Sequence, residues 1–225
     1  DFTEGIRNGS NLQMPGCGFD SARELIRAFK EGRIAKQEID ERVDELLTAA
    51  LTFPKRSAEE KHKLEGQKES LYEEHHRLAG RAAEESIVLL KNEENILPLK
   101  AGTRVALIGD FAFSPRYQGA GSSCVNAILV ETTAEEIRKT ELVLVGAERG
   151  YQRSGKADKK REASALKLAG EADTVLFFLG LGEQEETEGT DRKSINIPQN
   201  QLSLLHKIAK VNPAVVAVLS TGSVV

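Results

Sequence analysis

A continuous apolar run at residues 175–179 (VLFFL) constrains the fold of this chain more than any other feature. A strand that covers a single face alternates apolar and polar residues, whereas an uninterrupted run is typical of a strand buried on both faces. Similar short runs occur at residues 104–108, 141–145 and 214–219, and helical patterns separate them at 133–138, 162–170 and 199–211. This alternation predicts an α/β fold: a mostly parallel sheet with right-handed crossovers and helices on both faces.

The N-terminal part of the chain follows a different pattern. Residues 1–16 have a loop-like composition, and helical periodicity follows over 21–30 and 34–50. This periodicity predicts a helical hairpin that needs a further element to pack on. Residues 54–69 are polar, rich in lysine and glutamate and begin with a proline, so we expect a linker there, followed by a second domain from residue 70.

Composition excludes several classes of function. The formal net charge of the 225 residues is −4 and no basic block occurs, so nucleic-acid binding is not indicated. No apolar segment approaches the roughly 18 residues that span a bilayer, so we expect no membrane partner. Cys17 and Cys124 lack metal-ligand spacing; we expect two buried or partly buried free thiols, with one disulfide as the alternative. Free thiols and an acidic pI fit a bacterial cytoplasm, and secretion is compatible too.

The segment after the apolar run is unusually acidic. Five acids occur in the nine residues 183–191, and they include Glu186, Glu188 and Asp191. A solvated surface loop is one interpretation; a calcium site is a second, but the regular oxygen-ligand spacing is absent. General acid/base catalysis is a third, since like-charged neighbours and partial burial can raise the pKa of a carboxylic acid that must donate a proton. Arg192 could hold one of these carboxylates ionised and leave another protonatable.

A glycine- and serine-rich segment, residues 118–123 (QGAGSS), follows the first apolar run. It lacks the G-x-G-x-x-G and G-K-[ST] patterns of nucleotide-binding loops. A tight loop with positive φ at its glycines is one interpretation, and close approach of its backbone to a polar ligand such as a sugar is another.

Several segments together resemble glycoside hydrolase family 3, the β-glucosidase and β-xylosidase group. They are GSNLQMPG at 9–16, AAEESIVLLKN at 82–92 with ILPL at 96–99, QGAGSS at 118–123, EGTDR at 188–192 with IPQNQ at 197–201, and NP at 212–213 with TGS at 221–223. Their order and spacing along nearly all of the chain make the resemblance specific. Two positions depart from the family pattern: Asn11 stands where Asp is usual, and Val224 where Pro is common.

The resemblance implies a domain organisation and a fold. Residues 1–53 would be the tail of a (β/α)₈ barrel, residues 54–69 a linker, and residues 70–225 the first part of the family's six-stranded α/β sandwich, with about four of its strands.

The resemblance also implies a mechanism, that of a retaining β-glycosidase which uses no cofactor and acts on a carbohydrate, a β-glucoside or a β-xyloside. Glu188 corresponds to the general acid/base, and Glu186 is the second candidate because a two-residue slip in the alignment would place it there. The substrate-binding candidates are Gln118, Gly119, Ser122, Asp191 and Arg192. The nucleophile is expected upstream of residue 1, so we expect this chain to be inactive by itself. The alternative is a non-catalytic ligand- or nucleotide-binding α/β domain, and a homo-oligomer is left open by either interpretation.

Overall fold

The computed structural model describes all residues except 1, 15, 66, 67 and 123. The chain forms two compact units, Asp1–Ser86 and Ile87–Val225. Each unit is built around its own cluster of buried apolar side chains.

The second unit contains the predicted parallel sheet. Its strands are β1 (Arg104–Ile108), β2 (Val143–Glu148), β3 (Thr174–Gly180) and β4 (Val215–Ser220), and they lie in the order β2-β1-β3-β4 with every pair parallel. The two longest helices of this unit are α6 (Lys159–Ala169) and α7 (Gln199–Val211). The short helix α5 (Thr133–Glu136) continues as a 3₁₀ turn, Ile137–Lys139. The predicted α/β fold is therefore confirmed, although β2 extends three residues beyond the expected strand at 141–145.

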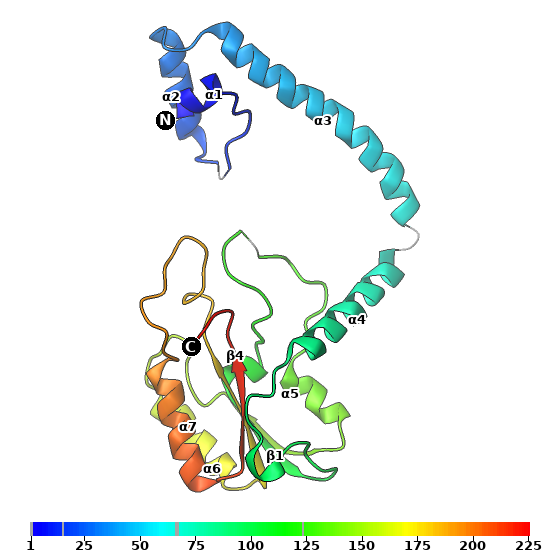
Figure 1. Cartoon of the computed structure of the whole chain (residues 1–225), viewed down its shortest axis with the longest axis vertical. Helices are drawn as coiled ribbons and strands as arrows, with labels where there is room; N and C mark the ends of the chain where they lie inside the picture. The colour runs from blue at the N-terminus through cyan, green and yellow to red at the C-terminus, as the bar shows by residue number, and fades with distance from the viewer. Residues whose placement is uncertain (1, 15, 66–67, 123) are drawn as a thin grey trace. The chain divides into compact units, whose positions relative to one another are not determined.

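Helices cover both faces of this sheet, as expected. The α6 and α7 helices lie side by side on one face, and α5 lies on the other (Figure 1). Strand order explains this arrangement, because the chain moves one way from β1 to β2 and the opposite way from β2 to β3 and from β3 to β4. Right-handed crossovers in opposite directions place their helices on opposite faces.

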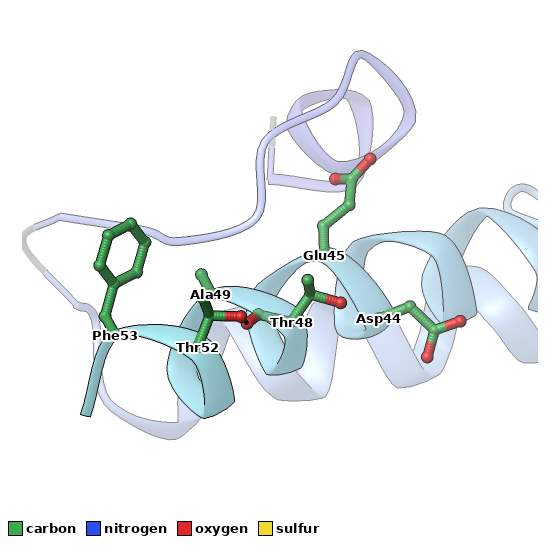
Figure 2. Close-up of a pocket in the computed structure, with 6 residues that line it drawn as sticks. All are labelled: Asp44, Glu45, Thr48, Ala49, Thr52 and Phe53. Carbon is green, nitrogen blue, oxygen red and sulfur yellow. Dashed lines mark hydrogen bonds between the residues drawn. The ribbon is translucent and has the colours of Figure 1, made fainter. Parts of the chain in front are cut away.

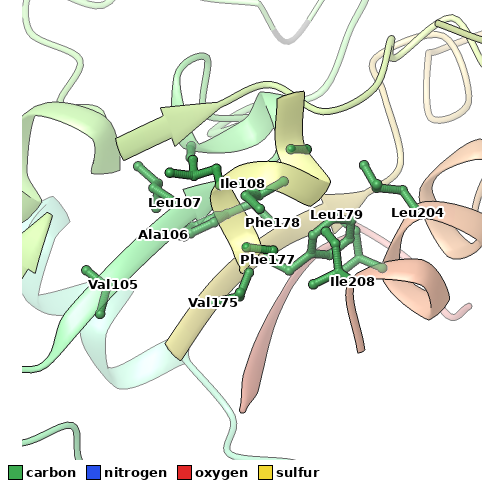
Figure 3. Close-up of a cluster of buried hydrophobic side chains, with 14 of the residues drawn as sticks. Val105, Ala106, Leu107, Ile108, Val175, Phe177, Phe178, Leu179, Leu204 and Ile208 are labelled. Atoms are coloured by element: carbon green, nitrogen blue, oxygen red, sulfur yellow. The ribbon is translucent and has the colours of Figure 1, made fainter. Parts of the chain in front are cut away.

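The two central strands are buried along almost their whole length. Four of the five residues of β1 and six of the seven residues of β3 are buried, whereas the edge strands β2 and β4 are partly exposed. Figure 3 shows their side chains packed with those of Leu204 and Ile208 from α7. Gly109 follows β1 directly at φ +125°, and a Cβ atom there would lie 2.1 Å from the Phe178 carbonyl oxygen. A side chain at this position would thus separate the ends of the two central strands.

A buried glutamine completes the hydrogen bonding at the end of β3. The side chain of Gln201, on α7, accepts a bond from Gly180 N at 2.9 Å and donates one to Gly180 O at 3.0 Å. The pairing of β1 with β3 ends at Phe177, so the backbone of Gly180 has no strand partner on that side. Gln201 substitutes for the missing strand.

The regular elements of the first unit's described residues are all helices, and one of our expectations for this unit was wrong. Residues 1–16 are not all loop, since Phe2–Arg7 form helix α1. Thr3 and Ile6 lie three residues apart on one face of α1 and are buried. Ile6 packs with Ala28 of α2 (Phe19–Lys30) and with Ile34, and α1 also contacts α3 (Lys36–Glu65). The element on which the predicted hairpin packs is therefore α1.

The expected linker is helical over most of its length. The α3 helix continues past Phe53 to Glu65, and α4 runs from Lys68 to Ser86; residues 66 and 67 lie outside the described residues. The α4 helix belongs to the first compact unit, so the contacts within the chain change at Ile87 rather than at residue 70. The proposed domain bounds stay a prediction. Cys17 and Cys124 are free, as expected, but both are exposed rather than buried.

The bonds of Gln201 lead to a stability prediction. Gln201→Leu keeps the volume of the side chain but leaves Gly180 N–H and C=O buried without partners, which costs about 1–3 kcal/mol of the free energy of unfolding. Urea denaturation of the 225-residue chain measures this change. Gln199→Leu, at an exposed position of the same helix, is the matched control and should change the free energy of unfolding little. An equal effect of the two substitutions would contradict the assigned role of Gln201.

Candidate functional site

The loops after β1 and β3 meet where the direction of the crossovers reverses. β1 and β3 are neighbours in the sheet, and the chain leaves them toward opposite edges. In open parallel sheets, ligands bind at the carboxyl ends of the strands on either side of such a reversal. The glycine-rich segment lies in the loop after β1, and the acidic segment lies in the loop after β3. Topology thus brings the two candidate segments together.

Backbone contacts join these two loops directly. Ala120 and Thr187 form an isolated parallel bridge between them. Gly121 has a φ of +90°, and a Cβ atom there would lie 2.8 Å from Glu188 Cβ. Only glycine allows this close approach, which accounts for one of the glycines in the QGAGSS segment.

Glu188 lies exposed at this junction. Its Oε2 atom accepts a hydrogen bond from Ser122 N at 2.9 Å and another from the Ser122 hydroxyl. These donors hold the pKa of Glu188 below its ordinary value, because they stabilise the ionised carboxylate. At Glu188 the shift is thus opposite to the raised pKa that the acid/base interpretation of the acidic segment invoked.

Glu186 lies in a different environment, with its side chain only 10% exposed. Arg116 Nη1 binds its Oε2 atom, Gly222 N donates to the same oxygen at 2.9 Å, and the Ser223 hydroxyl donates to Oε1. Burial by itself would raise the pKa of Glu186, but the bonds from Ser223, Gly222 and Arg116 together lower it. Glu186 is consequently an ionised carboxylate whose oxygens are already occupied.

Arg192 contributes to the same cluster. Its Nη1 atom lies 3.9 Å from Glu186 Oε1 and donates to Ser223 Oγ at 2.5 Å and to Val224 O at 2.8 Å. Arg192 thus joins the acidic loop to the segment after β4, whereas Asp191 is exposed. The arginine lies beside one carboxylate, Glu186, and leaves Glu188 to other partners. Direct contact of either residue with substrate stays a prediction.

Gln118 and Gly119 shape their own loop. Gln118 Oε1 accepts from Val125 N at 2.9 Å, and its Nε2 donates to Val125 O at 3.2 Å. The Cys124 thiol donates to Gly119 O at 3.1 Å. Ser123 lies outside the described residues. These bonds close the loop that presents Ser122 to Glu188.

Three residues of the site escaped the sequence analysis: Asp110, Arg116 and Arg153. Asp110 follows β1, is buried and binds Arg149 and Arg153, whose Nε atom lies 2.6 Å from Asp110 Oδ2. Arg153 also binds Glu183 of the acidic loop at 2.7 Å. Charge complementarity could have revealed Arg153, because the basic loop after β2 and the acidic loop after β3 lie at the same edge of the sheet.

Two hollows of the described chain are lined by residues outside this junction. One, of about 490 Å³, is on α3 and is lined by Asp44, Glu45, Thr48, Ala49, Thr52 and Phe53 (Figure 2). Another, of about 280 Å³, lies beside α6 and α7. Among the described residues, no three His, Cys, Asp or Glu side chains gather as metal ligands, and no helix is long and apolar enough to cross a membrane. The candidate site itself is formed by the loops after β1 and β3 together with the segment after β4.

Comparison with known proteins identifies the family. Residues 87–225 match the model of the glycosyl hydrolase family 3 C-terminal domain. The chain belongs to glycoside hydrolase family 3. The resemblance expected from the motifs is confirmed, and the family 3 match spans both loops of the candidate site.

Curated relatives and solved structures agree with this assignment. The chain is 35% identical to thermostable β-glucosidase B of Acetivibrio thermocellus and 33% identical to an exo-α-(1→6)-L-arabinopyranosidase of Bifidobacterium breve, which align with 99% and 98% of it. It covers 29% of the length of each. A family 3 β-glucosidase structure from Bifidobacterium adolescentis aligns with the whole chain, and with 32% of its own, at 32% identity and a TM-score of 0.64. These family 3 relatives are about three times as long as the chain.

The contact between Ser122 and Glu188 can be tested in this family 3 chain. Ser122→Ala removes the hydroxyl donor and should raise the pKa of Glu188 toward its ordinary value, because the ionised carboxylate loses a hydrogen bond. NMR titration of the ¹³C-labelled carboxyl group measures the change. Ser203→Ala, on α7, is the matched control. If the pKa of Glu188 stays constant after Ser122→Ala, or shifts equally in the control, the contact does not form in solution.

Proposed function

We propose that this chain supplies the general acid/base, Glu188, of a retaining β-glycosidase. The observation that carries the proposal is the contrast between two neighbouring carboxylates. Glu188 is exposed where the loops after β1 and β3 meet, whereas the side chain of Glu186 is only 10% exposed and is bound by Arg116, Gly222 and Ser223. A group that exchanges protons with a substrate must be accessible to it.

In this mechanism, a nucleophilic carboxylate attacks the anomeric carbon while Glu188 transfers its proton to the departing glycosidic oxygen. The now ionised Glu188 then removes a proton from the water that hydrolyses the glycosyl-enzyme intermediate. The hydrogen bonds from Ser122 stabilise the ionised form, which is the form that the second step needs. The first step needs the protonated form. A second carboxylate roughly 5–5.5 Å away would raise the pKa of Glu188 and so favour this protonated form.

We further propose that the nucleophile comes from outside these 225 residues. The chain spans 29–32% of the length of the relatives. The site described here is built from its loops after β1, β2, β3 and β4. A terminal β-linked sugar is the proposed substrate, a β-glucoside first. The nucleotide-binding alternative has less support, because the glycine-rich loop does not lead into a helix N-terminus: residues 124–132 contain no helix.

Kinetics of the full-length enzyme test the role of Glu188. Glu188→Ala should lower kcat about 10²–10⁴-fold for aryl β-glucosides with poor leaving groups, and far less for dinitrophenyl β-glucoside, which departs without a proton. Added azide should restore part of the rate by occupying the space of the missing carboxylate.

Two controls accompany this experiment. Glu185→Ala, in the same loop, should leave kcat nearly unchanged. The 225-residue chain by itself should show no turnover; a rate comparable with that of the full-length enzyme would show that it contains its own nucleophile. The assignment of Glu188 is wrong if azide rescues Glu186→Ala instead.

A further inference from the structure

Three glutamates of the acidic loop, Glu183, Glu186 and Glu188, bind residues of other segments at this edge of the sheet. Glu183 binds Arg153 from the loop after β2, and Glu188 binds Ser122 from the loop after β1. Glu186 lies between them and binds two segments at once: Arg116 after β1 and the Gly222–Ser223 turn after β4. The acidic loop is thus attached at several points, and Glu186 is the point where the most segments meet.

Burial makes the pair of Glu186 and Arg116 unlike the other ion pairs of this loop. The two side chains are 10% and 9% exposed, whereas Glu183 is 45% exposed. Arg116 Nη1 also donates to Leu181 O at 3.4 Å, so the same side chain holds the start of the loop. A buried carboxylate that loses its partner is strongly destabilising, whereas an exposed pair contributes little. The conformation of the loop therefore depends on this pair.

Glu186 lies two residues before Glu188 in the chain. The Thr187 bridge to Ala120 and the approach of Gly121 to Glu188 require that both loops keep their positions. Arg116 lies two residues before the QGAGSS segment and Glu186 lies two residues before Glu188, so a single ion pair fixes the chain just ahead of both contacting segments.

We infer that Glu186 and Arg116 form a positioning pair, which holds Glu188 and Ser122 in contact and takes no part in proton transfer. This inference rests on the proposed function of Glu188. Glu186 is not a second acid: its oxygens accept hydrogen bonds from three donors, Arg116, Gly222 and Ser223. The charged Arg192 Nη1 atom lies a further 3.9 Å from Oε1.

Hydrogen exchange in the 225-residue chain tests the structural part. Glu186→Gln should speed amide exchange about tenfold or more in all three segments that Glu186 joins, residues 113–122, 183–192 and 220–225. Peptides from β1 and β3 should stay protected, which shows that the variant folds. The control Glu185→Gln, in the same loop, should leave exchange in the other two segments unchanged. Faster exchange confined to residues 183–192, or an equal effect of the control, would overturn the inference.

A double substitution separates the pair from its members. Arg116→Met leaves the Glu186 carboxylate buried with fewer partners and should loosen the same three segments. Arg116→Met with Glu186→Met replaces both charges by apolar groups of similar volume and should restore part of the protection. The bonds from Arg192 to Ser223 and Val224 involve neither substituted residue. If the double variant instead loses as much protection from amide exchange as the two single variants together, the residues act independently. That result would overturn the inference that they form a pair.

Kinetics of the full-length enzyme test the positioning part. Glu186→Gln should lower kcat for poor leaving groups, with KM changed less than kcat, and azide should not restore the rate because the Glu188 carboxylate still occupies its place. Azide rescue of Glu186→Gln would show that Glu186 is the acid and would overturn the inference. If the exchange results agree with the inference but the loss of kcat in Glu188→Ala does not depend on the leaving group, the proposed function is wrong. In that case the role of Glu186 and Arg116 in joining the loops is still supported.

Discussion

The pairing of β1 with β3 at the centre of the parallel sheet is the constraint on which the rest of this structure depends. The two strands are buried on both faces, and Gly109 lets their carboxyl ends stay in contact. Because the chain leaves them toward opposite edges, the loops that follow extend over the same edge of the sheet. The site is thus a consequence of topology: one loop supplies Ser122 and the other supplies Glu188.

Charge neutralisation then gives the acidic loop its conformation. In the sequence alone, five acids in nine residues are as typical of a solvated surface loop as of a catalytic loop. In the structure, Glu183, Glu186 and Glu188 each bind a partner from another segment, so the loop is not a solvated run of charge. Glu186, the least exposed of the three ion-paired or hydrogen-bonded carboxylates, holds the loop, and Glu188, two residues on, stays accessible. One short segment thereby provides both a carboxylate that joins other segments, Glu186, and an accessible carboxylate, Glu188.

Much of the fold could be predicted from the sequence, and the failures have physical reasons. Helix Gln199–Val211 was predicted to the residue, because Pro198 precedes it and its apolar face is regular. Helix α1 was missed, since a helix of six residues has little periodicity and owes its stability to the packing of Ile6. The linker expected after Phe53 is helical in spite of its composition. In the site, the acidic loop and Ser122 were predicted from motifs, but Arg116 was not, because nothing local distinguishes an arginine whose partner lies 70 residues away.

The most direct test of the whole account is one distance in a crystal structure of the full-length enzyme with a bound, non-hydrolysable β-glucoside. The account predicts that the carboxyl group of Glu188 lies roughly 5–5.5 Å from a carboxylate that does not belong to these 225 residues, with the anomeric carbon between them. Glu186 should remain bound to Arg116 in the same structure. If Glu186 occupies the position beside the glycosidic oxygen, or if Glu188 lies more than about 9.5 Å from any nucleophilic carboxylate, the assignment of the acid/base is wrong.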